Sequence, residues 1–308
     1  MYEGLLIEPQ LGLLPLGRDS DSGLWEFWHV QSGDMPQRGP DGKLQLTETS
    51  GLVLVLIPGG SFWMGAQDSE GYQNHDSRAQ SDENPVHLVT LSPYFLSKYE
   101  MTQGQWIALT GHNPSNYSAG KIWADRKVTM LHPVEQVSWE GTMAVLPRWG
   151  LQHPTEAQWE RAARGGTESP FWSGFDRETL QEPLAANIAD QTTVEEGTGW
   201  SGNRDWPEFN DGWLTHAPVD TMAPNPYGLL HIHGNVWEWC LDSWGAYYYS
   251  RSPSENPNHQ PPVSRHRAFR GGAFNSSIFD VRVSNRNNFT PAGRDNNLGL
   301  RPARTLTP

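Results

Sequence analysis

The side chains in this 308-residue chain that could do redox or metal chemistry are few. Cys240 is the only cysteine, and it directly follows Trp-Glu-Trp, a stretch that we expect to be buried. A lone buried thiol is typical of a small core residue rather than of a nucleophile. His231 and His233 would share one face of a strand, but two imidazoles without a nearby cysteine or third histidine fall short of a zinc site. These residues therefore predict neither an intrachain disulfide nor a zinc centre.

Charged residues are numerous, and their balance limits the function classes. The formal net charge is −13, which disfavours a general nucleic-acid or anionic-membrane surface, because such binding needs clustered Lys and Arg. No acid–base pair can be assigned, and no nucleophile-elbow or phosphate-binding glycine motif occurs. Arginines gather near the C-terminus, at Arg265, Arg267, Arg270, Arg282, Arg286, Arg294, Arg301 and Arg304. Their single spacing favours guanidinium forks that tie loop carbonyls and carboxylates together, with phosphate binding as the alternative.

Residues 270–301 read RGGAFNSSIFDVRVSNRNNFTPAGRDNNLGLR and combine a regular frame with an irregular interior. The interior run from Asn275 to Asp280 mixes small, apolar, aromatic and charged side chains. It follows neither the strand period nor the helical period that burial imposes. We therefore expect this run to form a surface. The alternative is that the asparagines and glycines only build turns.

The elements that position these residues are expected to be short. Fifteen Trp, 31 Gly and 24 Pro predict a core filled by large aromatics and a backbone rich in turns. The apolar run 52–57 predicts a buried strand, and residues 25–29 alternate like a second short strand. From about residue 167 onward we expect only short strands and loops.

Two helices are predicted by capping boxes. Thr102 with Gln105 opens a helix that runs to about residue 110, and Thr155 with Gln158 opens another that stops at Gly165. A third helix is expected after Ser138. The chain's first residues lack a basic region and are broken by prolines, so we expect neither a secretory signal nor a membrane span, and a cytoplasmic location.

Six ordered motifs carry a family resemblance. They are IPGGSFWMG (57–65), EMT (100–102), PVEQVSWE (133–140), PTEAQWERAARGG (154–166), NPYGLLHIHGNVWEW (225–239) and FRGG (269–272). Together they resemble the formylglycine-generating enzyme, or sulfatase-modifying factor, family over roughly residues 52–304. The resemblance implies an α+β, loop-rich variant of the C-type lectin fold with few helices and short antiparallel strands. We expect an N-terminal extension (1–50) packed on a main domain (51–308) whose variable region is about 270–301.

The resemblance also implies two structural calcium sites with oxygen ligands. The matching residues are Asn187, the Ile188 carbonyl, Asp211 and the Trp213 carbonyl at one site, and Glu238 with the carbonyls of His233, Gly234 and Val236 at the other. From the residues alone, an ordinary turn at Asp211 and a solvated strand position at Glu238 are the alternatives.

One part of the family pattern is missing. Its oxidases bind copper through paired cysteines shortly after Arg-Gly-Gly, because copper(I) prefers soft thiolates, whereas residues 273–280 contain no cysteine. We therefore expect no copper and no formylglycine-generating activity. A related branch uses iron bound by a separate helical domain, which residues 1–50 are too short to supply.

A second resemblance is narrower. The order RGG, mixed residues, SNRNN and then R-x-NN-L-G-L-R is similar to the variable region of proteins diversified by retroelements, in which template adenines are miscopied. Miscopied Asn codons never give Trp, Met, Lys, Gln or Glu, and the interior residues all obey this rule. The residues that would display ligand contacts are Ala273, Phe274, Asn275, Ser276, Ser277, Ile278, Phe279, Asp280, Asn287, Phe289, Gly293 and Asp295.

The sequence thus predicts a noncatalytic binding protein. Its diversified surface would recognise a protein ligand, with calcium as a structural ion and no general nucleic-acid binding. Aromatic anchors beside adaptable polar groups on a rigid scaffold are typical of such surfaces. The alternatives are an enzyme of the formylglycine-generating or sulfoxide synthase type with altered chemistry, and an undiversified regulatory scaffold.

Overall fold

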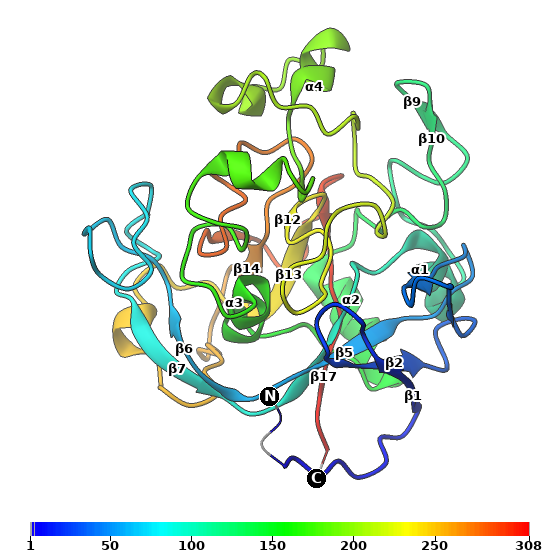
Figure 1. Cartoon of the computed structure of the whole chain (residues 1–308), viewed down its shortest axis with the longest axis horizontal. Coiled ribbons are helices and arrows are strands. Elements are labelled where there is room, and N and C mark those ends of the chain that lie inside the picture. Colours follow the sequence, from blue (N-terminus) through cyan, green and yellow to red (C-terminus); the bar gives the residue numbers. More distant parts are fainter. Residues whose placement is uncertain (1, 3, 308) are drawn as a thin grey trace.

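The computed structural model describes residue 2 and residues 4–307, and it shows a loop-rich α+β structure built from short strands and helices (Figure 1). The larger sheet has five strands in the order β1-β2-β5-β8-β17, and all of its pairings are antiparallel. Its strands are β1 (Leu13–Arg18), β2 (Trp25–His29), β5 (Val53–Ile57), β8 (Tyr94–Ser97) and β17 (Ala303–Thr305). The strands predicted at 25–29 and 52–57 are confirmed, and every residue of β5 is buried.

A second sheet positions the C-terminal segment. It has the order β15-β14-β13-β16, in which β13 and β16 run parallel and the other pairs antiparallel. Its strands are β13 (Trp237–Ser243), β14 (Arg267–Arg270), β15 (Asn287–Phe289) and β16 (Leu298–Gly299). The two-stranded pairs are β3 (Gln37–Arg38) with β4 (Leu44–Gln45), β6 (Gly60–Met64) with β7 (His87–Leu91), β9 (Ile122–Trp123) with β10 (Arg126–Lys127), and β11 (Ala186–Asn187) with β12 (His233–Gly234).

The helices begin where the sequence predicts. Thr102 and Thr155 each form a complete capping box, at the starts of α1 (Gln103–Thr110) and α3 (Glu156–Arg164). Ser138 caps α2 (Trp139–Val145), the third predicted helix. The remaining helical turns are α4 (Gln191–Glu195) and the 3-10 turns at Leu146–Trp149, Arg177–Leu180, Gly202–Asp205 and Tyr249–Arg251. No helix among the described residues is long and apolar enough to cross a membrane.

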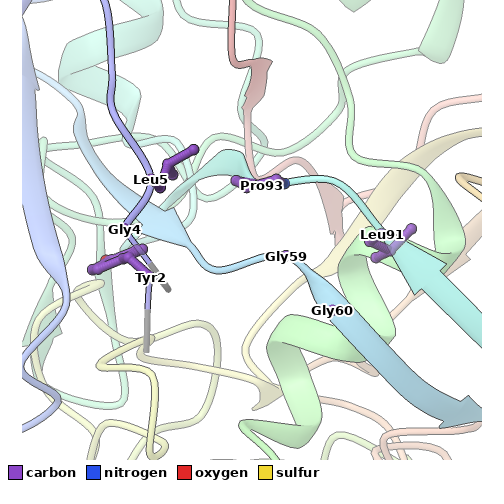
Figure 2. Close-up of a pocket in the computed structure, with 7 residues that line it drawn as sticks. All are labelled: Tyr2, Gly4, Leu5, Gly59, Gly60, Leu91 and Pro93. Carbon is purple, nitrogen blue, oxygen red and sulfur yellow. The ribbon is translucent and has the colours of Figure 1, made fainter.

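The N-terminal residues are part of the larger sheet. Strand β1 pairs with β2, and β2 pairs with β5, so residues before position 50 extend the sheet of the main domain. The Tyr2 hydroxyl donates to the Leu56 carbonyl at 2.8 Å, close to a depression of about 390 Å³ beside Gly59 and Gly60 (Figure 2). Among the described residues, the side chains that line that depression are uncharged. The domain boundary near residue 50 stays a prediction.

Large aromatic residues fill the interior, as the composition indicates. Trp159, Trp206 and Trp239 are among the largest fully buried side chains. Trp159 belongs to a cluster with β5, β7 and α3 residues, and Trp206 to a separate cluster under the loops of residues 171–209. Three arginines, Arg270, Arg282 and Arg301, are buried equally deeply, and they determine how the C-terminal segment is held.

Candidate ligand-binding surface and metal site

Buried arginines fasten residues 270–301 to α3. Arg270 donates to Glu156 at 3.1 Å and to Glu160 at 2.6 Å, and Arg286 donates to Glu156 at 2.7 Å. Burial alone would raise the pKa of Glu156, but the facing guanidinium groups outweigh it and lower that pKa. Guanidinium forks on carboxylates are therefore the role of these arginines, and phosphate binding is not needed to explain them.

Two further arginines bind distant carboxylates. Arg282 pairs with Asp76 at 2.6 Å and with Glu83 at 2.7 Å, while Arg301 pairs with Glu238 at 2.8 Å. All of these side chains are at most 5% exposed, so each pair is shielded from water. Removing one member would leave an unpaired charge in the interior, which is strongly destabilising. The frame of the segment is thus held by electrostatics.

Gly271 and Gly272 turn the chain from β14 into the variable loop. Their φ angles are +100° and +78°, a region that other residues rarely adopt. A Cβ atom on Gly272 would also come within 2.3 Å of Val281 Cγ1. Only glycine fits at this close approach, which brings the start and end of the loop together.

Four residues that we expected to display to a ligand are buried instead. Ala273, Phe274 and Ile278 are 0% exposed and Ser276 is 7% exposed, so the expectation of a continuous surface from 273 to 280 is wrong at these positions. Ile278 packs into the cluster that contains Trp206, and Phe274 lies edge-on to Tyr117 with 5.5 Å between ring centroids.

The remaining residues of the loop are partly exposed. Asn275, Ser277 and Asp280 line an open depression of about 390 Å³, together with Trp200 and Asp205 from a neighbouring loop. The Ser277 hydroxyl donates to Asp205 at 2.6 Å, and the Trp200 ring lies 5.3 Å from the ring of buried Phe274. Residues 199–205 show no hydrophobic periodicity, so sequence reasoning missed their contribution to this surface.

Phe279 lies outside this depression and is half-buried. The guanidinium of Arg78 lies 4.1 Å from its ring centroid, in a cation–π contact that holds the ring at the surface.

A second group of expected display residues follows β14. Asn287, Phe289 and Asp295 are exposed, and Gly293 is half-buried beside the Phe289 ring. The Asn297 side chain donates to Asn275 at 2.9 Å, which joins this group to the variable loop. The variable loop and the segment that follows Asp295 therefore contact each other through this pair of side chains.

The two side chains of the first predicted metal site lie together. Asn187 Nδ2 donates to Asp211 at 3.1 Å, the Trp213 and Ile188 amides also donate to that carboxylate, and Asn187 Oδ1 is buried without a hydrogen-bond partner. Burial, helped by the neighbouring Asp190 carboxylate, raises the pKa of Asp211 well above its usual range. A free amide oxygen beside a carboxylate that forms no ion pair among the described residues fits a hard cation such as calcium.

The second predicted metal site does not fit a cation. Both Glu238 oxygens accept from Arg301, and one also accepts from Trp159 Nε1 at 2.6 Å. The carboxylate is thus neutralised by a buried guanidinium, which would repel a metal ion from the carbonyls of His233, Gly234 and Val236. This ion pair disfavours calcium at Glu238, and the ion there stays a prediction.

The candidate zinc and thiol residues are structural. His231 Nε2 lies 3.0 Å from the Pro218 carbonyl, and His233 Nδ1 lies 2.7 Å from the Val281 carbonyl. Throughout residue 2 and residues 4–307, no group of three or more His, Cys, Asp or Glu side chains could hold a metal ion. Cys240 is fully buried, and burial raises the pKa of its thiol, which confirms its role as a core residue.

Comparisons with known proteins agree with this architecture. Over residues 43–306 the chain matches the sulfatase-modifying factor enzyme 1-like domain. The formylglycine-generating enzyme of Streptomyces coelicolor is 32% identical over 81% of this chain and 88% of its own. Two solved structures are each 25% identical. Treponema denticola variable protein 1 has a TM-score of 0.63 over 84% of this chain and 98% of its own, and PvdO from Pseudomonas aeruginosa has 0.62 over 89% and 100%.

These similarities confirm the predicted C-type lectin-like fold of the formylglycine-generating enzyme type. The similar proteins include both a named enzyme and a variable protein. This chain has a single cysteine and therefore no cysteine pair. Because the match spans most of its residues, the protein belongs to the family of sulfatase-modifying factor enzyme 1-like domains.

Proposed function

We propose that this protein is a noncatalytic binding protein whose loop after β14 displays a diversified surface to a protein ligand. The display residues are Asn275, Ser277, Phe279, Asp280, Asn287, Phe289 and Asp295. The buried residues Ala273, Phe274, Ser276 and Ile278 support the loop from beneath in this proposal.

One observation carries the proposal, namely the separation of the frame from the displayed side chains. The buried ion pairs of the segment are made by frame residues such as Arg270 and Arg286, and none of the display residues takes part in a salt bridge among the described residues. Surface substitutions outside such networks typically change stability by about 0.5 kcal/mol or less. The display side chains can therefore vary while the backbone under them stays in place.

The sequence of the loop and one relative support this function. The displayed residues are all reachable from Asn codons by changes at adenines, as retroelement diversification requires. Treponema denticola variable protein 1 shares the fold over 84% of this chain. The absence of paired cysteines supports a noncatalytic role, because formylglycine generation in the family depends on copper held by thiolates.

A variant with four substitutions tests whether the display residues can change without affecting the frame. Asn275→Tyr, Ser277→Asn, Phe279→Ser and Asp280→Asn are all reachable from Asn codons. We expect the variant to remain folded, with a melting temperature within a few degrees of the wild type, and to bind a different set of proteins in crosslinking experiments on one cell extract. Loss of cooperative folding, or an unchanged set of crosslinked proteins, would contradict the display role.

The gene itself gives the sharper test. DNA around the gene should contain a reverse transcriptase and an imperfect repeat of codons 270–301, and sister isolates should differ at adenine-derived positions of the display codons. Substitutions spread evenly over the whole gene would leave an undiversified scaffold as the better explanation. Stoichiometric copper or iron in the purified protein would instead favour an enzyme with altered chemistry.

Calcium at Asn187 and Asp211 is part of the proposal. A ligand that binds only the folded state raises the melting temperature, so chelation is expected to lower it. Asp211→Ala should remove the difference between calcium and chelator, whereas the exposed control Asp68→Ala should retain it. Equal melting curves in calcium and in chelator, on protein shown to start metal-loaded, would argue against the ion.

The pH dependence of the calcium effect has a defined sign. Without a cation, the raised pKa of folded Asp211 contributes stability below the unfolded-state pKa, and this stability is lost as the pH rises through the folded-state pKa. Calcium binds the ionised carboxylate and offsets that loss. The difference in melting temperature between calcium and chelator should therefore be largest near neutral pH and shrink as the pH falls.

A further inference from the structure

A cavity of about 600 Å³, unconnected with the variable region, lies where the N-terminal residues meet the main domain. One wall comes from the N-terminal segment, with Asp19, Asp21, Lys43 and Leu44. Other walls come from the end of β8 and from two loops, with Lys98, Tyr99, Trp172, Pro183, Asp220, Thr221, Met222, Ala223, Pro224 and Leu230. Asp19 and Asp21 precede residue 43, where the family match begins, whereas Lys43 and Leu44 lie inside it. The volume falls in the range of about 300–1,000 Å³ typical of small-molecule sites.

The buried charges of the cavity neutralise one another. Lys98, which is 7% exposed, donates to Asp19 at 2.9 Å and to Glu26 at 2.6 Å, and Arg38 completes the cluster by donating to Glu26 at 2.6 Å. Burial opposes ionisation of Asp19, but the Ser22 amide and Lys98 outweigh it and lower its pKa to about 2. Two cations thus face two carboxylates in this cluster, and it needs no ligand to balance it.

At the mouth of the cavity, one carboxylate remains. Lys43 and Asp21 form an exposed pair at 3.5 Å, whereas the Asp220 carboxylate has no salt-bridge partner among the described residues. Asp220 is exposed at this mouth, and desolvation by the surrounding chain raises the pKa of its carboxyl. The surplus charge of the lining is therefore negative.

The Tyr99 hydroxyl is a second unused polar group. Tyr99 is 5% exposed and lines the cavity, yet its hydroxyl makes no hydrogen bond within the described part of the chain. Burial, together with the carboxylates of Glu26, Asp220 and Asp19, raises the pKa of Tyr99, so this hydroxyl stays protonated in a negative field. Its oxygen can accept a hydrogen bond from a cationic ligand.

Apart from Thr221, the rest of the wall is formed by apolar side chains. Met222 and Leu230 are buried, Trp172 is half-buried, and Pro183 and Pro224 complete the surface. A ligand that fills this space would bury an apolar body and place one charged group near Tyr99 and Asp220. Small-molecule sites commonly combine such an apolar lining with a few polar groups that fix orientation.

We propose that this cavity binds a small organic amine, whose ammonium group pairs with Asp220 and the Tyr99 hydroxyl while its apolar body contacts Trp172 and Met222. The site lies outside residues 270–301, and it would exist whether or not the variable loop binds a protein.

Three probes of similar size and different charge test the proposal on the full chain. They are 2-phenylethylamine, 2-phenylethanol and 3-phenylpropanoate, each titrated by ligand-observed NMR and calorimetry. We expect the amine to bind at least about tenfold more tightly than the alcohol, and the carboxylate to bind more weakly still, because a tenfold change corresponds to about 1.4 kcal/mol, within the range of one charge-assisted hydrogen bond.

Matched variants locate the site. Asp220→Asn should weaken amine binding by about tenfold or more, whereas the exposed control Asp68→Asn should not change it. Tyr99→Phe should weaken it several-fold without loss of folding, because its hydroxyl has no protein partner to leave unsatisfied. The proposal is overturned if the amine does not bind, if the three probes bind equally, or if Asp220→Asn and Asp68→Asn behave alike. None of these results bears on the display function, which depends on other residues.

Discussion

Arg301→Met is expected to lower the free energy of unfolding by about 3 to 5 kcal/mol, the usual cost of leaving one member of a buried ion pair unpaired. Arg301 is 0% exposed and makes three hydrogen bonds to Glu238, from Nε to both oxygens at 3.0 Å and from Nη2 to Oε1 at 2.8 Å. It also donates to the carbonyls of Lys98 and Leu230, so its loss leaves several buried acceptors unsatisfied. Urea denaturation followed by fluorescence would measure the change.

A control in the same segment separates this effect from a general loss of charge. Arg294 is exposed and forms no ion pair among the described residues, so Arg294→Met should change stability by about 0.5 kcal/mol or less. The double variant Arg301→Met with Glu238→Gln should recover part of the loss, because it removes the unpaired buried carboxylate. Equal effects of the two single arginine variants would refute the assignment of Arg301 to the frame.

Ile278→Ala should be the second large effect, with a loss of about 2 to 5 kcal/mol from the lost burial and the cavity left behind. Ile278 is 0% exposed and packs with Trp206 and Phe209, although it stands between displayed residues. Asn275→Ala, at a partly exposed position in the same loop, should cost about 1 kcal/mol or less through its contact with Asn297. Thermal and urea melts of both variants would check the contrast.

The relative costs of Ile278→Ala and Asn275→Ala decide which positions of this loop can be diversified. If Ile278→Ala proves as mild as Asn275→Ala, the burial of Ile278 has no energetic weight and the whole run 275–280 is free to vary. If Ile278→Ala is costly, most substitutions at codon 278 give proteins that fold poorly. The useful variation is then confined to the exposed neighbours of Ile278.

Local signals in the sequence were enough to predict the helix starts. The capping boxes at Thr102 and Thr155 involve residues three positions apart, so they can be read without the fold. The role of the arginines could also be predicted, because guanidinium forks match carboxylates. Their partners could not, since Arg282 and Asp76 lie 206 residues apart in the chain.

The features that the sequence could not predict share one physical cause. Each depends on contact with residues that are distant in the chain. Ile278 was predicted to be exposed because its packing partners Trp206 and Phe209 lie in a distant loop without hydrophobic periodicity. The family resemblance predicts Glu238 as a calcium ligand, but its ion-pair partner Arg301 lies 63 residues away and could not be paired with it from the sequence. The depression beside Ser277 and Asp280 was missed because five of its eight lining residues belong to another loop.

The shared carboxylate of Glu156 has a consequence for the entropy of the variable loop. Arg270 and Arg286 contact this one side chain from opposite ends of residues 271–285, so the ends of the loop are held together by α3. The entropy cost of closing the loop is therefore set by these two ion pairs and by the length of the loop. Neither depends on the side chains in between. Exchange of those side chains alters what the loop presents while the cost of closing it stays the same.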